Sequence, residues 1–301
     1  MRIATLLPSA TEIVCALGLS ESLVGISHDC DYPPEIRRRP VLSEAIVGAE
    51  LPSRTIDERI RGQVHKGKSV YHLDERQLAQ LRPDLILTQE LCEVCAPSYS
   101  LVKQAAKVLD ADTKIVSLEP LGLMDVLDNI LLVGELTGAA ARAAHLVGIL
   151  RDRIERVKMA VAGLPAQSVV CLEWLDPLFV AGHWVPEMVE DAGGRELLGR
   201  SRQPSFVVEW ETIRAADPEV LVVMPCGFDI PRVREEMHLL TDRPGWDGLR
   251  AVREGQVYLT EATSYFSRPG PRLVDGLEIL ASILHPEIPQ LEIRAGSVQR
   301  L

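Results

Sequence analysis

The stretch Gly138–Gly163, GAAARAAHLVGILRDRIERVKMAVAG, decides the fold that the sequence predicts. Apolar residues recur along it in steps of three and four: Ala143, Val147, Leu150, Ile154, Val157 and Val161. This spacing places them on one face of an α-helix. A helix of roughly 24 residues, at about 1.5 Å per residue, is about 36 Å long, the diameter of a small domain. We therefore predict one long helix that ties two lobes together and holds them apart.

The composition of the chain limits its class, its partners and its location. The chain has 301 residues, of which 47% are hydrophobic, enough for one or two buried cores. Its net charge of −11 and scattered basic residues argue against a nucleic-acid partner. The apolar run after Met1 breaks at Pro8, so we expect neither a signal peptide nor a membrane span. Six irregularly spaced cysteines favour a reducing cytoplasm, with a periplasmic or surface location only if a signal was trimmed.

Strand and helix patterns alternate on both sides of this helix. In the N-terminal half, strands are predicted at 2–7, 23–26, 84–87 and 114–118, and helices at 9–17, 56–64, 74–81, 101–109 and 125–136. In the C-terminal half, strands are predicted at 168–172, 178–180, 220–224 and 256–259, and helices at 185–191, 209–215, 231–239 and 271–284. Ser9-Ala-Thr-Glu12 reads as a capping box that starts the first helix. The alternation predicts an α/β fold of two doubly wound lobes. The expected boundaries are 1–138 for the first lobe, 139–163 for the helix and 164–301 for the second lobe.

Polar and aromatic side chains collect where the predicted strands end. The loop HDCDYPP (28–34) follows the second strand, and TQELCEVC (88–95) follows the third. In the second half, Glu173-Trp174, Gly182-His-Trp184, Pro225-Cys226-Gly227 and TSYFSR (263–268) occupy similar places. Only 4% of the chain is aromatic, so aromatics gathered at these edges suit a broad organic ligand. The alternative is that each tryptophan or histidine serves the core of its own lobe.

The pair Cys92-x-x-Cys95 has three interpretations. Two thiolates one turn apart can share a zinc ion, form a reversible disulfide, or pack as ordinary thiols. A structural zinc site needs four ligands, and the chain has no second CxxC and no HxxxH. His28 and Cys30 would complete a site only if folding brings the loops together. The metal-ligand candidates are His28, Cys92, Cys95 and His183.

Six segments together carry a family resemblance. They are LLPSATEIVCALG (6–18), HDCDYPP (28–34), LRPDLILTQ (81–89), PLFVAGHWVPEMVEDAGG (177–194), AADPEVLVV (215–223) and SRPGPRLVDGLEILASIL (267–284). The sequence resembles the periplasmic-binding-protein-like cobalamin and iron-siderophore binding proteins over about residues 1–285, and within them the cobalamin-binding branch. The resemblance implies two α/β lobes joined by one long helix, a ligand cleft between the lobes and little hinge motion.

The resemblance and the strand-end pattern together give the expected ligand-binding residues: Pro8, Ser9, His28, Tyr32, Gln89, Glu90, Cys92, Trp174, His183, Trp184, Cys226, Tyr265, Phe266 and Arg268. In importer-associated relatives a glutamate on each lobe docks onto permease arginines, which here implies Glu211 and Glu75. The sequence departs from the family in three ways: no export signal, an additional segment at about 44–70, and the CxxC loop.

The function predicted from these features is non-enzymatic binding of a corrinoid such as cobalamin. The protein would act as a substrate-binding protein of an ABC importer, or as a cytoplasmic corrinoid carrier. Because a corrinoid accepts an axial imidazole or thiolate, His28, His183 and Cys92 have a chemical use. One alternative is a metal-dependent enzyme using His28, Cys92, Cys95 and His183, although no HExxH, GxSxG or Walker motif is present. Another is a ferric-siderophore binder, which needs several cationic site residues, and of these only Arg268 stands out.

Overall fold

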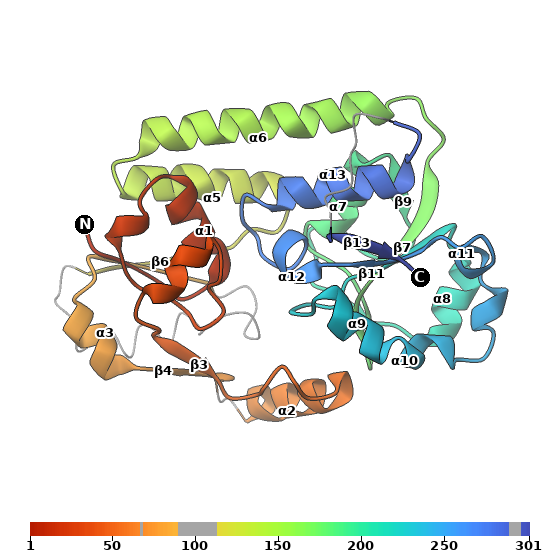
Figure 1. The fold of residues 1–301 in the computed structure, drawn as a ribbon, viewed down its shortest axis with the longest axis horizontal. Coiled ribbons are helices and arrows are strands. Elements are labelled where there is room, and N and C mark those ends of the chain that lie inside the picture. The colour runs from red at the N-terminus through yellow and green to blue at the C-terminus, as the bar shows by residue number, and fades with distance from the viewer. Residues whose placement is uncertain (67–68, 90–112, 289–295) are drawn as a thin grey trace. The chain divides into compact units, whose positions relative to one another are not determined.

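A computed structural model describes residues 1–66, 69–89, 113–288 and 296–301, which form two compact units (Figure 1). The first unit comprises Met1–Leu51, Thr55–Pro120 and Asp125–Gly148, and the second Pro52–Arg54, Leu121–Met124 and Ile149–Leu301. Each unit has its own main β-sheet. None of the helices described is both long enough and apolar enough to cross a membrane.

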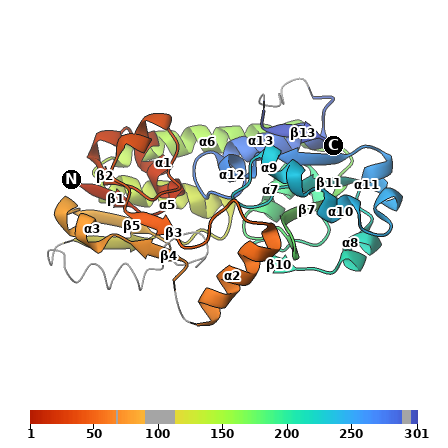
Figure 2. The same ribbon diagram turned by 60° about the horizontal axis from the view of Figure 1, so that its bottom comes forward.

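The first unit is built on a four-stranded sheet in the order β2-β1-β5-β6, with parallel pairing throughout. Its strands are β1 (Ile3–Thr5), β2 (Leu23–Gly25), β5 (Leu85–Thr88) and β6 (Lys114–Ser117). The helices that lie wholly or mainly in this unit are α1 (Pro8–Ala16), α2 (Ser53–His65), α3 (Glu75–Leu81) and α5 (Leu123–Leu136), with 3-10 turns at Ser20–Ser22 and Pro34–Arg38. A separate antiparallel pair, β3 (Ser43–Ala45) and β4 (Tyr71–Leu73), is visible in Figure 2. Because the four main strands run in one direction, their carboxyl ends meet at one edge.

The second unit contains a seven-stranded mixed sheet. Parallel pairing joins β7 (Gln167–Leu175), β9 (Gly194–Glu196), β11 (Val220–Val223) and β12 (Val257–Thr260). Antiparallel strands β8 (Leu178–Val180), β10 (Phe206–Val207) and β13 (Val298–Arg300) extend it. Its helices are α7 (Val185–Asp191), α8 (Trp210–Ala216), α9 (Ile230–Glu236), α10 (His238–Thr241), α11 (Arg250–Arg253), α12 (Ala262–Tyr265) and α13 (Leu273–Leu284), with a 3-10 turn at Trp246–Gly248. In Figure 1, α13 lies on one side of this sheet, and α9 and α10 lie on the other.

The long helix is confirmed as α6 (Ala140–Val161), which has 22 residues. All six apolar positions of the predicted stripe, from Ala143 to Val161, are buried. Near its middle, the Arg153 guanidinium donates to Glu278 Oε1 at 2.8 Å and also binds Asp275, both on α13. The hydrogen bond to Glu278 is the largest of the effects that raise the pKa of Arg153. In the second unit, the ion pairs of Arg153 with Asp275 and Glu278 therefore connect α6 to α13, in addition to the apolar face of α6.

The α/β fold class is confirmed, but several strands were not predicted. Strands β3, β4, β9, β10 and β13 each contain only two or three residues, too few for a period-two pattern to emerge from the sequence. Strand β8 was predicted, but the pattern does not show that it pairs antiparallel with β7. The second sheet is consequently mixed rather than purely parallel.

The predicted capping box at Ser9–Glu12 is wrong. The N-cap of α1 is Leu7, whose side chain makes no capping hydrogen bond, and Ser9 lies inside the helix. Pro8 explains the difference, because its fixed φ and missing N–H suit the first helical position. By contrast, the Asp74 side chain caps α3 by accepting from Gln77 N at 2.8 Å.

We predict that Arg153→Ala lowers the free energy of unfolding by about 2–4 kcal/mol, because the buried Asp275 carboxylate loses its guanidinium partner. The side chains of Arg153 and Asp275 are only 19% and 8% exposed. Lys158→Ala, which removes a more exposed pair with Asp191 on the same helix, is the control and should cost about 0–1 kcal/mol. Urea denaturation followed by circular dichroism measures both values. An equal loss of unfolding free energy in the two variants would show that the Arg153 ion pairs are no more stabilising than the exposed pair.

Candidate functional site

In the first unit, the predicted residues Pro8, Ser9, His28 and Gln89 follow three neighbouring parallel strands. Pro8 and Ser9 open α1 shortly after β1, His28 lies beyond β2, and Gln89 comes directly after β5. Ser9 and Gln89 are buried, whereas Pro8 and His28 are half-buried. The sheet therefore brings these residues to one edge, as parallel topology requires.

A buried chain of small polar groups supports this edge. Thr5 Oγ1, at the end of β1, lies 2.6 Å from Thr11 Oγ1 on α1. Thr11 Oγ1 in turn lies 2.9 Å from Cys30 Sγ in the loop after β2. These contacts tie that loop to the first helix, which fixes the backbone near His28.

His28 is held from two sides. Its Nδ1 lies 3.0 Å from Ser43 Oγ on β3, and its ring lies 5.6 Å from the ring of Tyr71 on β4, centroid to centroid. Its Nε2 lies 3.4 Å from the Asp29 carboxylate. Tyr32, four residues further on, is exposed. The β3–β4 pair thus positions His28. The sequence predicted this histidine as a site residue but did not indicate its contacts with Ser43 and Tyr71.

The CxxC loop lies outside the described residues, and so do the predicted positions Glu90, Cys92 and Cys95. Within the part of the chain that the structure describes, no group of three or more His, Cys, Asp or Glu side chains could hold a metal ion. The metal assignments for the CxxC loop therefore stay predictions.

In the second unit, Trp174 lies near the end of β7 and is half-buried. Its Nε1 donates to the Ser53 carbonyl oxygen at 3.3 Å, and its ring packs against Phe228 with centroids 5.1 Å apart. Cys226, also half-buried, donates its backbone N–H to the Glu173 carbonyl oxygen at 3.0 Å. The strand-end residues Trp174 and Cys226 are therefore brought close together.

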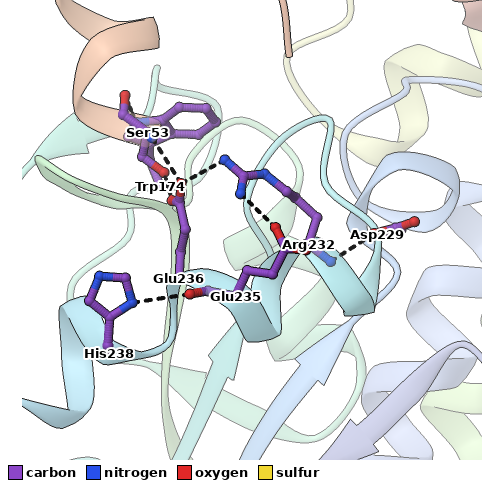
Figure 3. Close-up of polar contacts among 7 residues, drawn as sticks. All are labelled: Ser53, Trp174, Asp229, Arg232, Glu235, Glu236 and His238. Atoms are coloured by element: carbon purple, nitrogen blue, oxygen red, sulfur yellow. Dashed lines mark hydrogen bonds and ion pairs between the residues drawn. The ribbon is translucent and has the colours of Figure 1, made fainter. Parts of the chain in front are cut away.

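The anchor of Ser53 is the buried carboxylate of Glu236, at the end of α9 (Figure 3). Its Oε1 accepts from Ser53 N at 3.0 Å and from Arg232 Nη2 at 2.7 Å, and its Oε2 accepts from Ser53 Oγ. Arg232 also lies over the Phe228 ring, 4.9 Å from its centroid. The carboxylate thus occupies the N-terminus of α2, where backbone N–H groups lack helical partners.

A second ion pair reinforces this anchor. Arg54 donates from Nε and Nη2 to the two carboxylate oxygens of Asp176, at 2.9 and 2.7 Å. Asp176 lies in the turn between β7 and β8. Such a two-point pair fixes orientation as well as distance. Residues 52–54 therefore belong structurally to the second unit, although the preceding and following residues belong to the first.

His183 and Trp184 are predicted site residues that the structure places in tightly packed surroundings. His183 has a positive φ of 51°, and its Nε2 is buried without a hydrogen-bond partner among the described residues. Burial lowers the pKa of His183 and favours its neutral form. Trp184 is buried and donates from Nε1 to the Phe266 carbonyl oxygen at 2.8 Å. Phe266 is also buried, while Tyr265 and Arg268 are half-buried.

Two carboxyl groups of the second unit, those of Glu173 and Glu196, are half-buried. Burial is the main cause that raises the pKa of Glu173 and of Glu196. Glu196 Oε1 accepts from the backbone N–H groups of Leu198 and Gly199 at 3.1 and 3.0 Å. Burial also raises the pKa of the nearby Cys171 thiol. Each of these shifts favours the protonated form of the group relative to its ordinary pKa.

The two glutamates proposed for permease docking are both exposed. Glu211 lies in the first turn of α8, beside Trp210, whose Nε1 donates to the Pro244 carbonyl oxygen at 2.9 Å. Glu75 is the first residue of α3. Their docking role stays a prediction.

Sequence reasoning missed the residues that support Trp174 and His28. Ser53 and Glu236 are 183 positions apart, and no local pattern links them. Ser43 and Tyr71 lie on two three-residue strands. One sequence feature could have indicated some of these residues: the additional segment at about 44–70 starts next to Ser43 and contains Ser53.

Aromatic rings and polar groups at strand ends are typical of proteins that bind small molecules. The chain matches the sequence model of the periplasmic binding protein family over residues 3–263. The chain belongs to that family, and it is a substrate-binding protein of the ABC-transporter type.

Individual comparisons agree with this membership. The chain is 26% identical over 296 residues to an uncharacterized ABC transporter substrate-binding lipoprotein of Bacillus subtilis, covering 95% of this chain and 80% of that protein. It is 25% identical over 289 residues to the vitamin B12-binding protein of Vibrio cholerae, covering 94% and 88%. A periplasmic heme-binding protein from Pseudomonas aeruginosa shares the fold, with a TM-score of 0.74, 22% identity and coverage of 99% and 97%.

We predict that Ser53→Ala speeds amide exchange in α2 and lowers the free energy of unfolding by about 1–3 kcal/mol, because a buried carboxylate loses one of its donors. Hydrogen–deuterium exchange of peptides covering residues 53–65 measures the local effect. Arg61→Ala, which removes an ion pair with Asp57 within the same helix, is the matched control and should leave exchange near Ser53 unchanged. Unaltered exchange in Ser53→Ala would show that the anchor does not hold the helix.

Proposed function

We propose that this protein binds a corrinoid of the cobalamin type, without chemical conversion, for delivery to an ABC permease. The observation that carries the proposal is the similarity to a vitamin B12-binding protein over 94% of the chain. Substrate-binding proteins of this class hold a small molecule and pass it to a membrane partner. The strand-end residues described above are the proposed ligand contacts.

The chemistry of those residues supports a large, partly apolar ligand. Trp174 offers an indole whose Nε1 is already bonded and whose ring is braced by Phe228. Tyr265 is half-buried, with the Arg272 guanidinium 6.0 Å from the centre of its ring. Braced aromatic rings lose little side-chain entropy on binding and bury much apolar area. The first unit, considered by itself, carries hydroxyl and imidazole groups near the ends of β1 and β2 that offer hydrogen-bond partners.

Heme and ferric siderophores are the competing ligands. A heme-binding protein shares this fold, and the siderophore alternative arises from the sequence resemblance. Both ligands carry carboxylates or a metal-bound chelate, which call for several cationic contacts. A metal-dependent enzyme remains the competing class, since Cys92 and Cys95 fall outside the described residues.

A parallel binding experiment tests the proposal. Purified protein is titrated calorimetrically with cyanocobalamin, hemin and a ferric hydroxamate, and thermal unfolding is recorded with each. We expect saturable one-to-one binding and a raised melting temperature with cyanocobalamin, because a ligand that binds only the native state stabilises it. Binding of hemin or the ferric chelate alone would overturn the corrinoid assignment. Stoichiometric zinc or iron in the purified protein, without cobalamin binding, would favour the enzyme.

We predict that Trp174→Ala weakens cyanocobalamin binding by about tenfold or more, equivalent to about 1.4 kcal/mol, because it removes a braced aromatic contact. Titration calorimetry at constant temperature gives both dissociation constants. Val207→Ala serves as the control, since Val207 is an exposed apolar residue of β10 in the same unit. An unchanged affinity in Trp174→Ala would exclude this tryptophan from the ligand site.

A further inference from the structure

The helix α2 differs in charge from the chain as a whole. Residues 53–66, which are the helix and the residue after it, contain four Arg and Lys side chains but only two acidic ones. The whole chain has a net charge of −11. The helix lies in the additional segment at about 44–70. A positive helix on a negative protein is attracted to negatively charged surfaces.

The helix carries an apolar stripe that the fold covers only in part. Ile56, Ile60 and Val64 follow one another at intervals of four residues and therefore lie on one face. Ile56 is 7% exposed, Ile60 is half-buried and Val64 is 38% exposed. The stripe is thus packed near the beginning of the helix, where Ser53 donates to Glu236, and uncovered toward its end.

Basic side chains flank the uncovered end of this stripe on both sides. At about 3.6 residues per turn, Arg59 and Lys66 lie on one side of the stripe, and Arg61 and His65 lie on the other. All four side chains belong to exposed residues. We call Arg59, Arg61, Val64, His65 and Lys66 together the basic end of α2.

The protein itself neutralises little of the charge at this end. Among the described residues, the side chains of Arg59 and Lys66 form no ion pair and no hydrogen bond. Arg61 Nε lies 2.8 Å from the Asp57 carboxylate, whose side chain is 16% exposed. Glu58 is the remaining acidic residue of α2, and it is exposed. Positive charge therefore predominates on the surface of this helix.

The dipole of the helix explains part of this pattern. Basic side chains in the last turn of a helix interact favourably with its negative end. This effect accounts for His65 and Lys66, which lie at the end of α2. It does not account for Arg59, which lies in the middle of the helix, a full turn before the last one. The flanking of the stripe on both sides needs another explanation.

A flat, negatively charged surface fits the two-sided arrangement. Helices that lie in the headgroup layer of a bilayer have an apolar face bordered by Lys and Arg. Each Lys or Arg close to an anionic bilayer strengthens association by about fivefold. A substrate-binding protein of the ABC-transporter type meets its permease at a bilayer, so lipid headgroups are present where it acts.

We propose that the basic end of α2 docks on the anionic phospholipid headgroups of the membrane that contains the permease. The Arg and Lys side chains contact lipid phosphates, and Val64 reaches the boundary of the acyl chains. Because little apolar area is exposed there, attraction between charges supplies most of the binding, which is reversible and weakened by salt. The negative charge of the chain as a whole disfavours contact through other faces. The contact does not depend on which small molecule the protein binds.

Vesicle flotation tests the proposal. Wild type, Arg59→Ala/Lys66→Ala and Arg151→Ala/Arg156→Ala are mixed with vesicles of phosphatidylcholine alone, or of phosphatidylcholine and phosphatidylglycerol in equal parts. The second double variant is the matched control, because it removes the same charge from two exposed residues of α6. Circular dichroism monitors folding, and Arg59→Gln/Lys66→Gln replaces the alanine variant if that variant is unfolded.

We expect wild type and the α6 variant to float with the phosphatidylglycerol vesicles and not with phosphatidylcholine alone. Raising the ionic strength well above the physiological value should release both proteins. The α2 variant should bind the anionic vesicles at least about tenfold more weakly, because two basic side chains are lost. Titration with cyanocobalamin should give the same result for all three proteins, since α2 contains none of the proposed ligand contacts.

The outcomes that contradict the proposal are distinct from a failure of the corrinoid function. Absence of wild type from the anionic vesicles, or equal binding by wild type and the α2 variant, would overturn the membrane contact. Binding of soluble polyglutamate without binding of vesicles would also overturn it, and would indicate an acidic protein as the partner. Vesicle binding that depends on α2, without any binding of cyanocobalamin, would reject the corrinoid function and support the membrane contact.

Discussion

The continuous apolar face of α6 is the constraint on which the two-unit architecture depends. The helix runs without interruption through the boundary between the units at 148/149, and its buried positions extend from Ala143 to Val161. The Arg153 guanidinium lies within this packing and forms ion pairs with two carboxylates of α13. A helix with an apolar face along its whole length must be covered along its whole length, so residues on both sides of the boundary need partners.

The features that could be predicted from the sequence are those encoded by local repetition. The stripe of α6 and the alternation of strands and helices depend on residues a few positions apart. Both are confirmed within the described residues, whereas the helix predicted at 101–109 lies outside them. The boundaries of β8 and α7 agree with the predicted ranges. The start of α1 was wrong because the capping pattern at Ser9 competes with Pro8, which takes the first helical position more readily. Edge strands such as β13 pair with distant segments and carry no period of their own.

In the candidate site, too, local features could be predicted from the sequence and contacts between distant segments could not. The sequence indicated which side chains stand at strand ends, because that follows from element order. It did not indicate what each side chain contacts. His28 and His183 look alike in the sequence, each in a short loop beside aromatic or acidic residues. The structure separates them: both nitrogens of His28 have polar neighbours, Ser43 and Asp29, whereas the Nε2 of His183 is buried without a hydrogen-bond partner among the described residues. Chemical role therefore depends on contacts between segments that are remote in the chain.

The carboxylate of Glu236 makes the second unit depend on a piece of chain from another part of the sequence. Ser53 donates to it from its backbone N–H and its hydroxyl, and residues 52–54 and 121–124 both belong to this unit. The units are consequently interleaved along the chain rather than arranged as successive modules. Cutting the gene within α6 would release neither unit intact, and a fragment beginning at residue 149 would carry a buried acid without the serine that completes it. The contact between positions 53 and 236 therefore makes the stability of the second unit depend on the segment at about 44–70.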